Sequence, residues 1–347
     1  MAPIKSSLAR TVGKLLGVQK DTDLSLRGDV HTSRLPPPEK VTASGGDIVD
    51  ALAPGNGYKY HTFTGNGTLT VSGGDAAVTI LLQGGGAGGG GGPGACGGGG
   101  AGGAVLYSVT LEPGTYPVSI GAGGGGSVPD SNRGSSGTDS RFGESTPVDI
   151  IAKGGGGGGA NPSTNAPGGG GGCGGGGGAG NGKAGGTETQ SGQNSGLQLE
   201  PGFVQFGTPG GTATVDPGNS NDGGGGGGGT GGAGGPGRSR SNPFNITLGI
   251  DGSRGGNGHY FAGFNGPLIG VPTLGPLNGY FGGGGGGRQQ NLSPNDRKYA
   301  PGGLGGGGNA NASPGNRNAT ANSGGGGGTP HAAGSGGSGI CVVKVKA

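Results

Sequence analysis

Short apolar runs with the patterns of β-strands occupy residues 56–153 and the end of the chain. The run "YKYHTFTGNGTLTVSG", which begins at Tyr58, alternates between two sets of side chains and reverses at "GNG", which predicts a β-hairpin. The continuous apolar run "AAVTILLQ" predicts a buried strand, and "AVLYSVTLEPGTYPVSIG" predicts two strands joined at residues 112–115. The terminal "GSGICVVKVKA" can pair with this set. The pattern therefore predicts a small antiparallel β-base with the first glycine rods over residues 56–153, closed by a strand at residues 339–347.

The first residues of the chain have the spacing of an amphipathic helix. Apolar residues recur at helical spacing over residues 1–22, and they are Ile4, Leu8, Val12, Leu15 and Leu16. Because basic side chains lie off this stripe and the segment is short, we expect an amphipathic helix that folds against a partner. A membrane-surface helix or a transit peptide would have the same pattern. Residues 23–55 have no period and include three consecutive prolines, which predicts an extended strap.

Glycine dominates the chain between these apolar runs. The sequence contains 106 glycines among 347 residues, and only 27% of its residues are hydrophobic, which excludes an ordinary globular domain. The glycines form solid blocks, as in "IAKGGGGGGANP" at residues 150–161, whereas collagen needs glycine at every third position. Two classes remain, a flexible low-complexity chain and an unusual glycine scaffold. The similar lengths of the blocks and the unequal segments between them favour a scaffold of rods joined by loops.

Side-chain-free rods can form a folded body through their backbones. An extended helix of three residues per turn presents N–H and C=O groups in three directions and can contact several neighbours at once. Such a rod must be glycine wherever it is buried, and only an outer rod can carry a side chain on its exposed third. We therefore expect a mostly β and irregular fold, in which a small antiparallel β-base carries a bundle of polyglycine II helices with variable loops over residues 154–338.

Charge, sorting signals and cysteines narrow the function only slightly. The formal net charge of +3 is too small to predict a nucleic-acid groove. No apolar stretch is long enough for a secretory signal core or a membrane span, so we expect synthesis in a cytoplasm and no membrane insertion. Cys96, Cys173 and Cys341 match neither a disulfide framework nor a zinc pattern, and we expect them to be small buried residues.

The motifs of the sequence predict no catalytic residue, cofactor or metal. Residues 177–183 satisfy the first part of a phosphate-loop pattern, but Ala184 stands where a Ser or Thr would bind Mg²⁺, and no strand precedes the match. The four histidines are isolated, and no serine stands in a nucleophile elbow. We expect a protein that is not an enzyme.

Aromatic residues gather in two inserts of the glycine-rich region, residues 197–209 and residues 242–281. These candidate contact residues are Phe203, Phe206, Phe244, His259, Tyr260, Phe261, Phe264, Tyr280 and Phe281. Exposed aromatic side chains anchor both protein and sugar partners, so the inserts are candidate binding loops. The alternative is that the rings form a small core that supports the insert, or a contact between copies of the chain.

The order of these features resembles a known family. The segments "YHTFTGNGTLTV", "VTILLQGGGAGGGGG", "VTLEPGTYPVSIGAGGGG" and "IIAKGGGGGG" are followed by repeated glycine blocks and a terminal "SGGSGICVVKVKA". Over about residues 56–347 this order resembles the glycine-rich domain of bacteriophage virion proteins. The block-and-loop layout is similar to that of the polyglycine-sandwich adhesins of tail fibres. The resemblance implies a polyglycine bundle whose variable loops contact a protein or glycan receptor on the host surface.

Residues 1–45 lie outside those adhesins and look like an anchoring peptide of a phage tail protein, which would bind other virion proteins. The resemblance thus implies a tail-fibre or tail-tip adhesin on the particle surface. The alternative from another class is a capsid decoration or head-appendage protein. An ice-binding bundle would need short G-x-x repeats, which are missing from the sequence.

Overall fold

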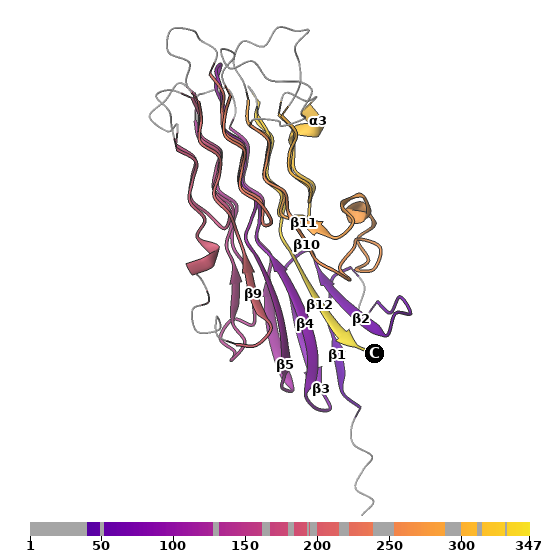
Figure 1. The fold of residues 1–347 in the computed structure, drawn as a ribbon. Helices are drawn as coiled ribbons and strands as arrows, with labels where there is room; N and C mark the ends of the chain where they lie inside the picture. The colour runs from indigo at the N-terminus through magenta and orange to yellow at the C-terminus, as the bar shows by residue number, and fades with distance from the viewer. Residues whose placement is uncertain are drawn as a thin grey trace, which may run out of the picture. The chain divides into compact units, whose positions relative to one another are not determined.

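The computed structural model describes residues 40–48, 52–127, 132–161, 167–179, 184–192, 194, 200–214, 222–238, 253–288, 300–310, 314–329 and 332–347. The chain divides into two compact units, Met1–Val41 and Thr42–Ala347. The predicted anchoring residues lie outside the described residues, and they are Ile4, Leu8, Val12, Leu15 and Leu16. Within the unit Thr42–Ala347, strands form a base, and extended glycine segments continue from it (Figure 1).

Two antiparallel five-stranded sheets form the base. One has the order β1-β3-β6-β7-β8, and its strands are Thr42–Ser44, Gly67–Ser72, Gly114–Ser119, Ser140–Phe142 and Ile150–Ala152. The other has the order β2-β12-β4-β5-β9, and its strands are Tyr58–Phe63, Ile340–Lys346, Ala76–Gln83, Ala104–Leu111 and Phe203–Phe206. The terminal strand β12 pairs with both β2 and β4. The predicted mostly β and irregular fold with antiparallel sheets is confirmed, as is the return of the C-terminal strand.

The predicted hairpin within residues 58–72 is wrong. Strands β2 and β3 lie in different sheets, so the turn at Gly65 and Asn66 carries the chain from one sheet to the other. Both faces of β2 are buried, because Phe63 packs between the sheets while Thr62 donates from its Oγ1 to Ile269 O at 2.7 Å on the opposite face. A hairpin would have left these strands side by side in one layer, whereas the crossing lets two sheets bury a shared core.

Apolar side chains of the facing sheets form the larger core. It includes Phe63, Ile80, Leu82, Val105 and Val343 from one sheet and Leu69, Val118, Phe142 and Ile150 from the other. Tyr116 and Phe142 stack within it, with ring centroids 5.7 Å apart. Full burial of each large side chain contributes about 1.5–3 kcal/mol, so this core can stabilise the base without the glycine segments adding apolar area.

The glycine segments hydrogen-bond to one another with a repeat of three residues. In the segment 84–91, every third N–H group from Gly84 donates to the segment 97–103. The two intervening series of N–H groups donate to residues 132–138 and to residues 334–337. This is the period that an extended helix of three residues per turn would give.

The segment 97–103 lies inside the bundle. It donates to the segments 153–160, 223–230 and 324–329 and accepts from the segments 84–91, 173–179 and 282–288. All its N–H groups and carbonyls are paired, and the Gln83 side chain donates to Gly102 O at 2.8 Å. The neighbouring backbones are so close that a Cβ on Gly98 would lie 2.1 Å from Gly285 O. Hydrogen-bonded backbone therefore takes the place of packed side chains in this region.

Side chains within the bundle follow the predicted pattern with exceptions. Exposed residues recur three positions apart in outer segments, in the pairs Ala184 and Thr187, Pro209 and Thr212, Ala233 and Pro236, Asn318 and Ala321, and Ala332 and Ser335. The expectation that a buried rod is all glycine is wrong at Ala87, Ala101 and Cys173, which are fully buried. The packing therefore leaves room for a small side chain at these positions but not at Gly98.

Candidate functional site

The second aromatic insert packs on the outer face of the sheet that contains β2. It includes β10 (His259–Tyr260), the 3₁₀ helix η3 (Pro272–Leu277) and β11 (Tyr280–Phe281), and β10 pairs with β11. Its buried side chains are Phe261, Phe264, Ile269, Val271, Leu274 and Phe281, which form one cluster with residues of β2, β4 and β12. Tyr60 of β2 meets Phe264 edge-on, with centroids 6.5 Å apart. The insert and the outer face of this sheet thus form a second apolar core.

Four of the candidate contact residues belong to cores. Phe261, Phe264 and Phe281 are at most 2% exposed and support the insert. Phe203 in β9 packs between the two sheets, where it meets Tyr107 edge-on at 5.2 Å. For these four rings the packing matches the alternative of a supporting core, because a partner cannot reach them in this structure. Phe244 lies outside the described residues.

Phe206 and His259 join the end of β9 to the insert. Their ring centroids are 4.2 Å apart, and Phe206 also meets Phe261 edge-on at 5.2 Å. Burial lowers the pKa of His259 below its ordinary value, so the imidazole is neutral at pH 7. The neutral ring packs here as one more aromatic side chain.

Tyr260 and Tyr280 are two of the predicted contact residues whose rings solvent reaches. Tyr260 is 53% exposed, and its ring centroid lies 5.4 Å from that of half-buried Tyr280. The two residues are directly paired in the β10–β11 ladder, so their side chains leave the same face. Gly279 has a φ of 86°, and a Cβ there would lie 3.1 Å from the Tyr260 ring, so this turn requires glycine.

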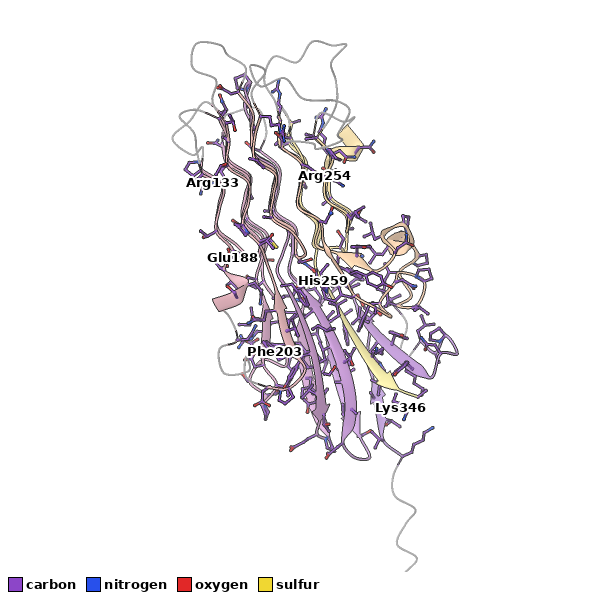
Figure 2. The ribbon with its side chains drawn as sticks, viewed as in Figure 1. Arg133, Glu188, Phe203, Arg254, His259 and Lys346 are labelled. Atoms are coloured by element: carbon purple, nitrogen blue, oxygen red, sulfur yellow. The ribbon has the colours of Figure 1, made fainter. Side chains whose placement is uncertain are left out.

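Arginine side chains occupy the ends of the glycine segments that lie away from the strands, which we call the distal end. They are Arg133, Arg238, Arg254, Arg288 and Arg317. Figure 2 shows Arg133 and Arg254 there, whereas Lys346 lies in the base. No local pattern in the sequence marks these residues as a group, because they are far apart along the chain. The available signal was that most of them directly flank a glycine segment.

Backbone carbonyls hold three of the distal arginines. The pairs are Arg133 Nε to Pro167 O at 3.0 Å, Arg288 Nη1 to Gly92 O at 3.2 Å and Arg317 Nη1 to Ala332 O at 3.0 Å. In the base, by contrast, Lys153 Nζ lies 2.6 Å from a carboxylate oxygen of Asp139, and Arg141 pairs with Asp149. A carbonyl orients a guanidinium but does not neutralise its charge.

Ser253 and Arg254 begin the segment 253–258 at the distal end. Ser253 Oγ and Arg254 Nε are buried and have no hydrogen-bond partner in the structure. The segment that ends at Arg288 is hydrogen-bonded to this one, because Gly287 N donates to Ser253 O at 2.7 Å. Burial lowers the pKa of Arg288, yet its guanidinium remains charged at pH 7.

The three cysteines belong to no metal-binding cluster among the described residues. The described residues contain no group of three or more His, Cys, Asp or Glu side chains that could hold a metal ion. Cys96, Cys173 and Cys341 are buried and form no disulfide, which confirms their prediction as small buried residues. Burial raises the pKa of Cys96 to about 11 and that of Cys173 to about 12, so both are protonated at pH 7. In the part of the chain that the structure describes, no helix is long and apolar enough to cross a membrane.

The chain belongs to the glycine-rich domain family. The model of that family matches residues 61–346, which extend from within β2 to the end of β12 and include the described glycine segments. The match therefore covers both the base and the bundle. No curated protein matches the sequence.

Proposed function

We propose that the protein is a structural protein of a bacteriophage virion and acts as a tail-fibre or tail-tip adhesin. In this proposal the bundle holds receptor-binding loops away from the particle, and residues 1–45 bind other virion proteins. The protein is made in the host cytoplasm, becomes part of the particle surface and binds a protein or glycan receptor. Its role is attachment, without catalysis, a cofactor or nucleic-acid binding.

The complete backbone pairing of the segment 97–103 carries this proposal. We infer that the glycine segments are polyglycine II helices, since their hydrogen bonds repeat every three residues. A segment with six bonded neighbours cannot bend unless buried hydrogen bonds break, and each buried group left unpaired costs about 1–3 kcal/mol. A stiff support of this kind suits a protein that must present loops in a fixed arrangement.

The chain stretches that continue from the distal end differ in length and composition. Residues 180–183 follow Ala179, residues 239–252 follow Arg238, and residues 289–299 follow Arg288. Unequal stretches on a regular support favour recognition of an outside partner, because a repeated cementing contact would use equivalent stretches. This difference favours the adhesin over the capsid decoration protein.

Immunogold microscopy of virions tests the location. An antibody against residues 242–281 should label the tail tip, and particles assembled without the protein should remain unlabelled. Label spread over the head would contradict the adhesin and favour a capsid decoration protein. Because the exposed Tyr260 and the half-buried Tyr280 lie within the antigen, the same antibody should also slow adsorption of the phage to its host.

Deletion of residues 1–41 tests the anchor. This deletion keeps β1, which pairs with β3 and whose Thr42 Oγ1 lies 2.8 Å from Ser72 Oγ. The shortened protein should be folded and should compete with phage for host cells, but it should not enter particles. Incorporation of the shortened protein at the normal level would refute the anchoring role of the N-terminal segment.

A further inference from the structure

Positive charge is concentrated at the distal end. Of the six charged side chains that the structure describes there, five are arginines and one is Asp222, which gives a net charge of +4. The stretches that continue from this end contain four basic and four acidic residues, which are Lys183, Arg240, Arg297, Lys298, Asp130, Asp216, Asp251 and Asp296. These stretches add no net charge, so the excess comes from arginines on the bundle itself.

The choice of basic residue also differs between the two ends. The lysines described in the unit Thr42–Ala347 are Lys59, Lys153, Lys344 and Lys346, and all belong to the base. The base also contains one arginine, Arg141, which pairs with Asp149. A guanidinium presents a planar set of donors that matches the two oxygens of a carboxylate or phosphate, whereas an ammonium acts as a point charge. Arginine held at a fixed place by a carbonyl therefore suits recognition of an oxyanion better than solubility alone.

Arg254 and Arg288 lie on two neighbouring segments of the distal end. Their segments are joined by the hydrogen bond from Gly287 N to Ser253 O, and no carboxylate of a described residue pairs with either guanidinium. The side chain of Arg254 makes no hydrogen bond, and its Nε is buried, as is the unpartnered Ser253 Oγ. Because no described carboxylate neutralises either guanidinium, an incoming group with several acceptor oxygens would add a charge-assisted attraction here.

We propose that Arg254 and Arg288 bind an anionic group, a phosphate or carboxylate, of a polysaccharide on the host surface. This inference rests on the proposed adhesin function for its biological setting and names the class of receptor. A nucleic acid is the less suitable polyanion, because its binding proteins spread basic residues along a groove or stripe. Here five of the six arginines described in the unit Thr42–Ala347 lie at one end, and the total charge of the chain is only +3.

Binding of the full-length protein to defined polymers tests the proposal. The probes are polygalacturonate, which carries carboxylates, polyphosphate, neutral dextran and a single-stranded oligonucleotide, each immobilised for interferometry. We expect binding to polygalacturonate or polyphosphate, weakening with added salt, and none to dextran. The double variant R254Q/R288Q should bind at least about tenfold more weakly, because each charge-assisted hydrogen bond to the anion is lost.

A matched pair of variants separates a local site from overall charge. K59Q/K346Q removes the same two charges from the base and should bind the anionic polymers like the wild type, while R254K/R288K should retain part of the affinity. Equal losses in R254Q/R288Q and K59Q/K346Q would overturn the proposal, as would tighter binding to the oligonucleotide than to both other polyanions. Absence of binding to any polyanion would also overturn it, yet would leave the tail-tip labelling of the adhesin proposal unchanged.

Discussion

The base and the bundle of this protein use side chains in opposite ways. In the base, large apolar residues such as Phe63 and Leu82 fill the space between two sheets, and the strand backbones pair with their neighbours within each sheet. In the bundle, the segment 97–103 makes backbone hydrogen bonds to six neighbours, and the near absence of side chains is what allows the segments to approach. Packed side chains therefore stabilise the base, whereas the absence of side chains lets backbone hydrogen bonds stabilise the bundle.

This difference predicts opposite responses to mutation. Removal of carbon atoms leaves cavities in the base, because its packed side chains relax only partly. Addition of a single carbon atom disturbs the bundle, because the nearest atom to a new Cβ is usually a backbone oxygen of a neighbouring segment.

Amide exchange should differ most between inner and outer glycines. The N–H groups of residues 97–103 all have acceptors, whereas those of Gly123, Gly125 and Gly126 have none in the part of the chain that the structure describes. We expect exchange in residues 97–103 to be slower by at least about a thousandfold, since it requires cooperative opening. Hydrogen exchange followed by NMR measures both sets in one sample. Equal rates in the two sets, near those of an unstructured peptide, would refute the hydrogen-bonded bundle.

Truncation of a buried ring should destabilise the base strongly. Phe261→Ala removes a ring that is 2% exposed and should lower the free energy of unfolding by about 3–5 kcal/mol. Tyr260→Ala is the control. Tyr260 precedes Phe261 in the sequence but is 53% exposed, so its truncation should change the free energy of unfolding much less. Thermal or denaturant unfolding measures both. A similar small loss in the two variants would contradict a core beneath the insert.

One added methyl should destabilise the bundle according to its position. Gly98→Ala places a Cβ 2.1 Å from Gly285 O and should cost about 1–3 kcal/mol, because the segments must separate. Gly125→Ala adds the same methyl where nothing lies within 4 Å, and it should be neutral or slightly stabilising. Unfolding midpoints of the two variants compare the positions directly. The contrast between regions would be lost if both substitutions were harmless.

The stability of the junction between base and insert should depend weakly on pH. His259 has a lowered pKa in the folded protein, so the unfolded chain binds a proton more readily below its ordinary pKa of 6.5. The stabilising contribution is therefore complete above that pH and is lost as the pH falls through the lowered value. Unfolding midpoints at about pH 7 and pH 5 should differ more for the wild type than for His259→Phe. The same pH dependence in both proteins would assign the effect to other groups.

Local pattern was sufficient for the parts of the fold that depend on backbone chemistry. The glycine blocks, the terminal strand and the exposed third of outer segments are visible in the sequence, because each follows from where a Cβ can or cannot be placed. The expectation that every buried position is glycine failed at Ala87 and Ala101. The packing has room for a methyl group at these two positions, and nothing in the local sequence separates them from the neighbouring glycines. The strand at residues 58–63 could be recognised from the sequence, but the strand with which it pairs could not. The turn sequence "GNG" is compatible both with a hairpin and with a connection between two sheets.

The candidate sites divide in the same way. The clustering of aromatic residues in inserts is evident in the sequence, as is the lack of large side chains to pack the glycine segments. Which rings are buried follows from the three-dimensional fold, which places Phe261 and Phe281 in a core and leaves Tyr260 exposed. The fold also brings Arg254 and Arg288 onto hydrogen-bonded segments at one end. The physical reason is that exposure and proximity depend on which segments become neighbours. In this bundle, neighbours are chosen by backbone hydrogen bonds, and one glycine segment looks like another in sequence.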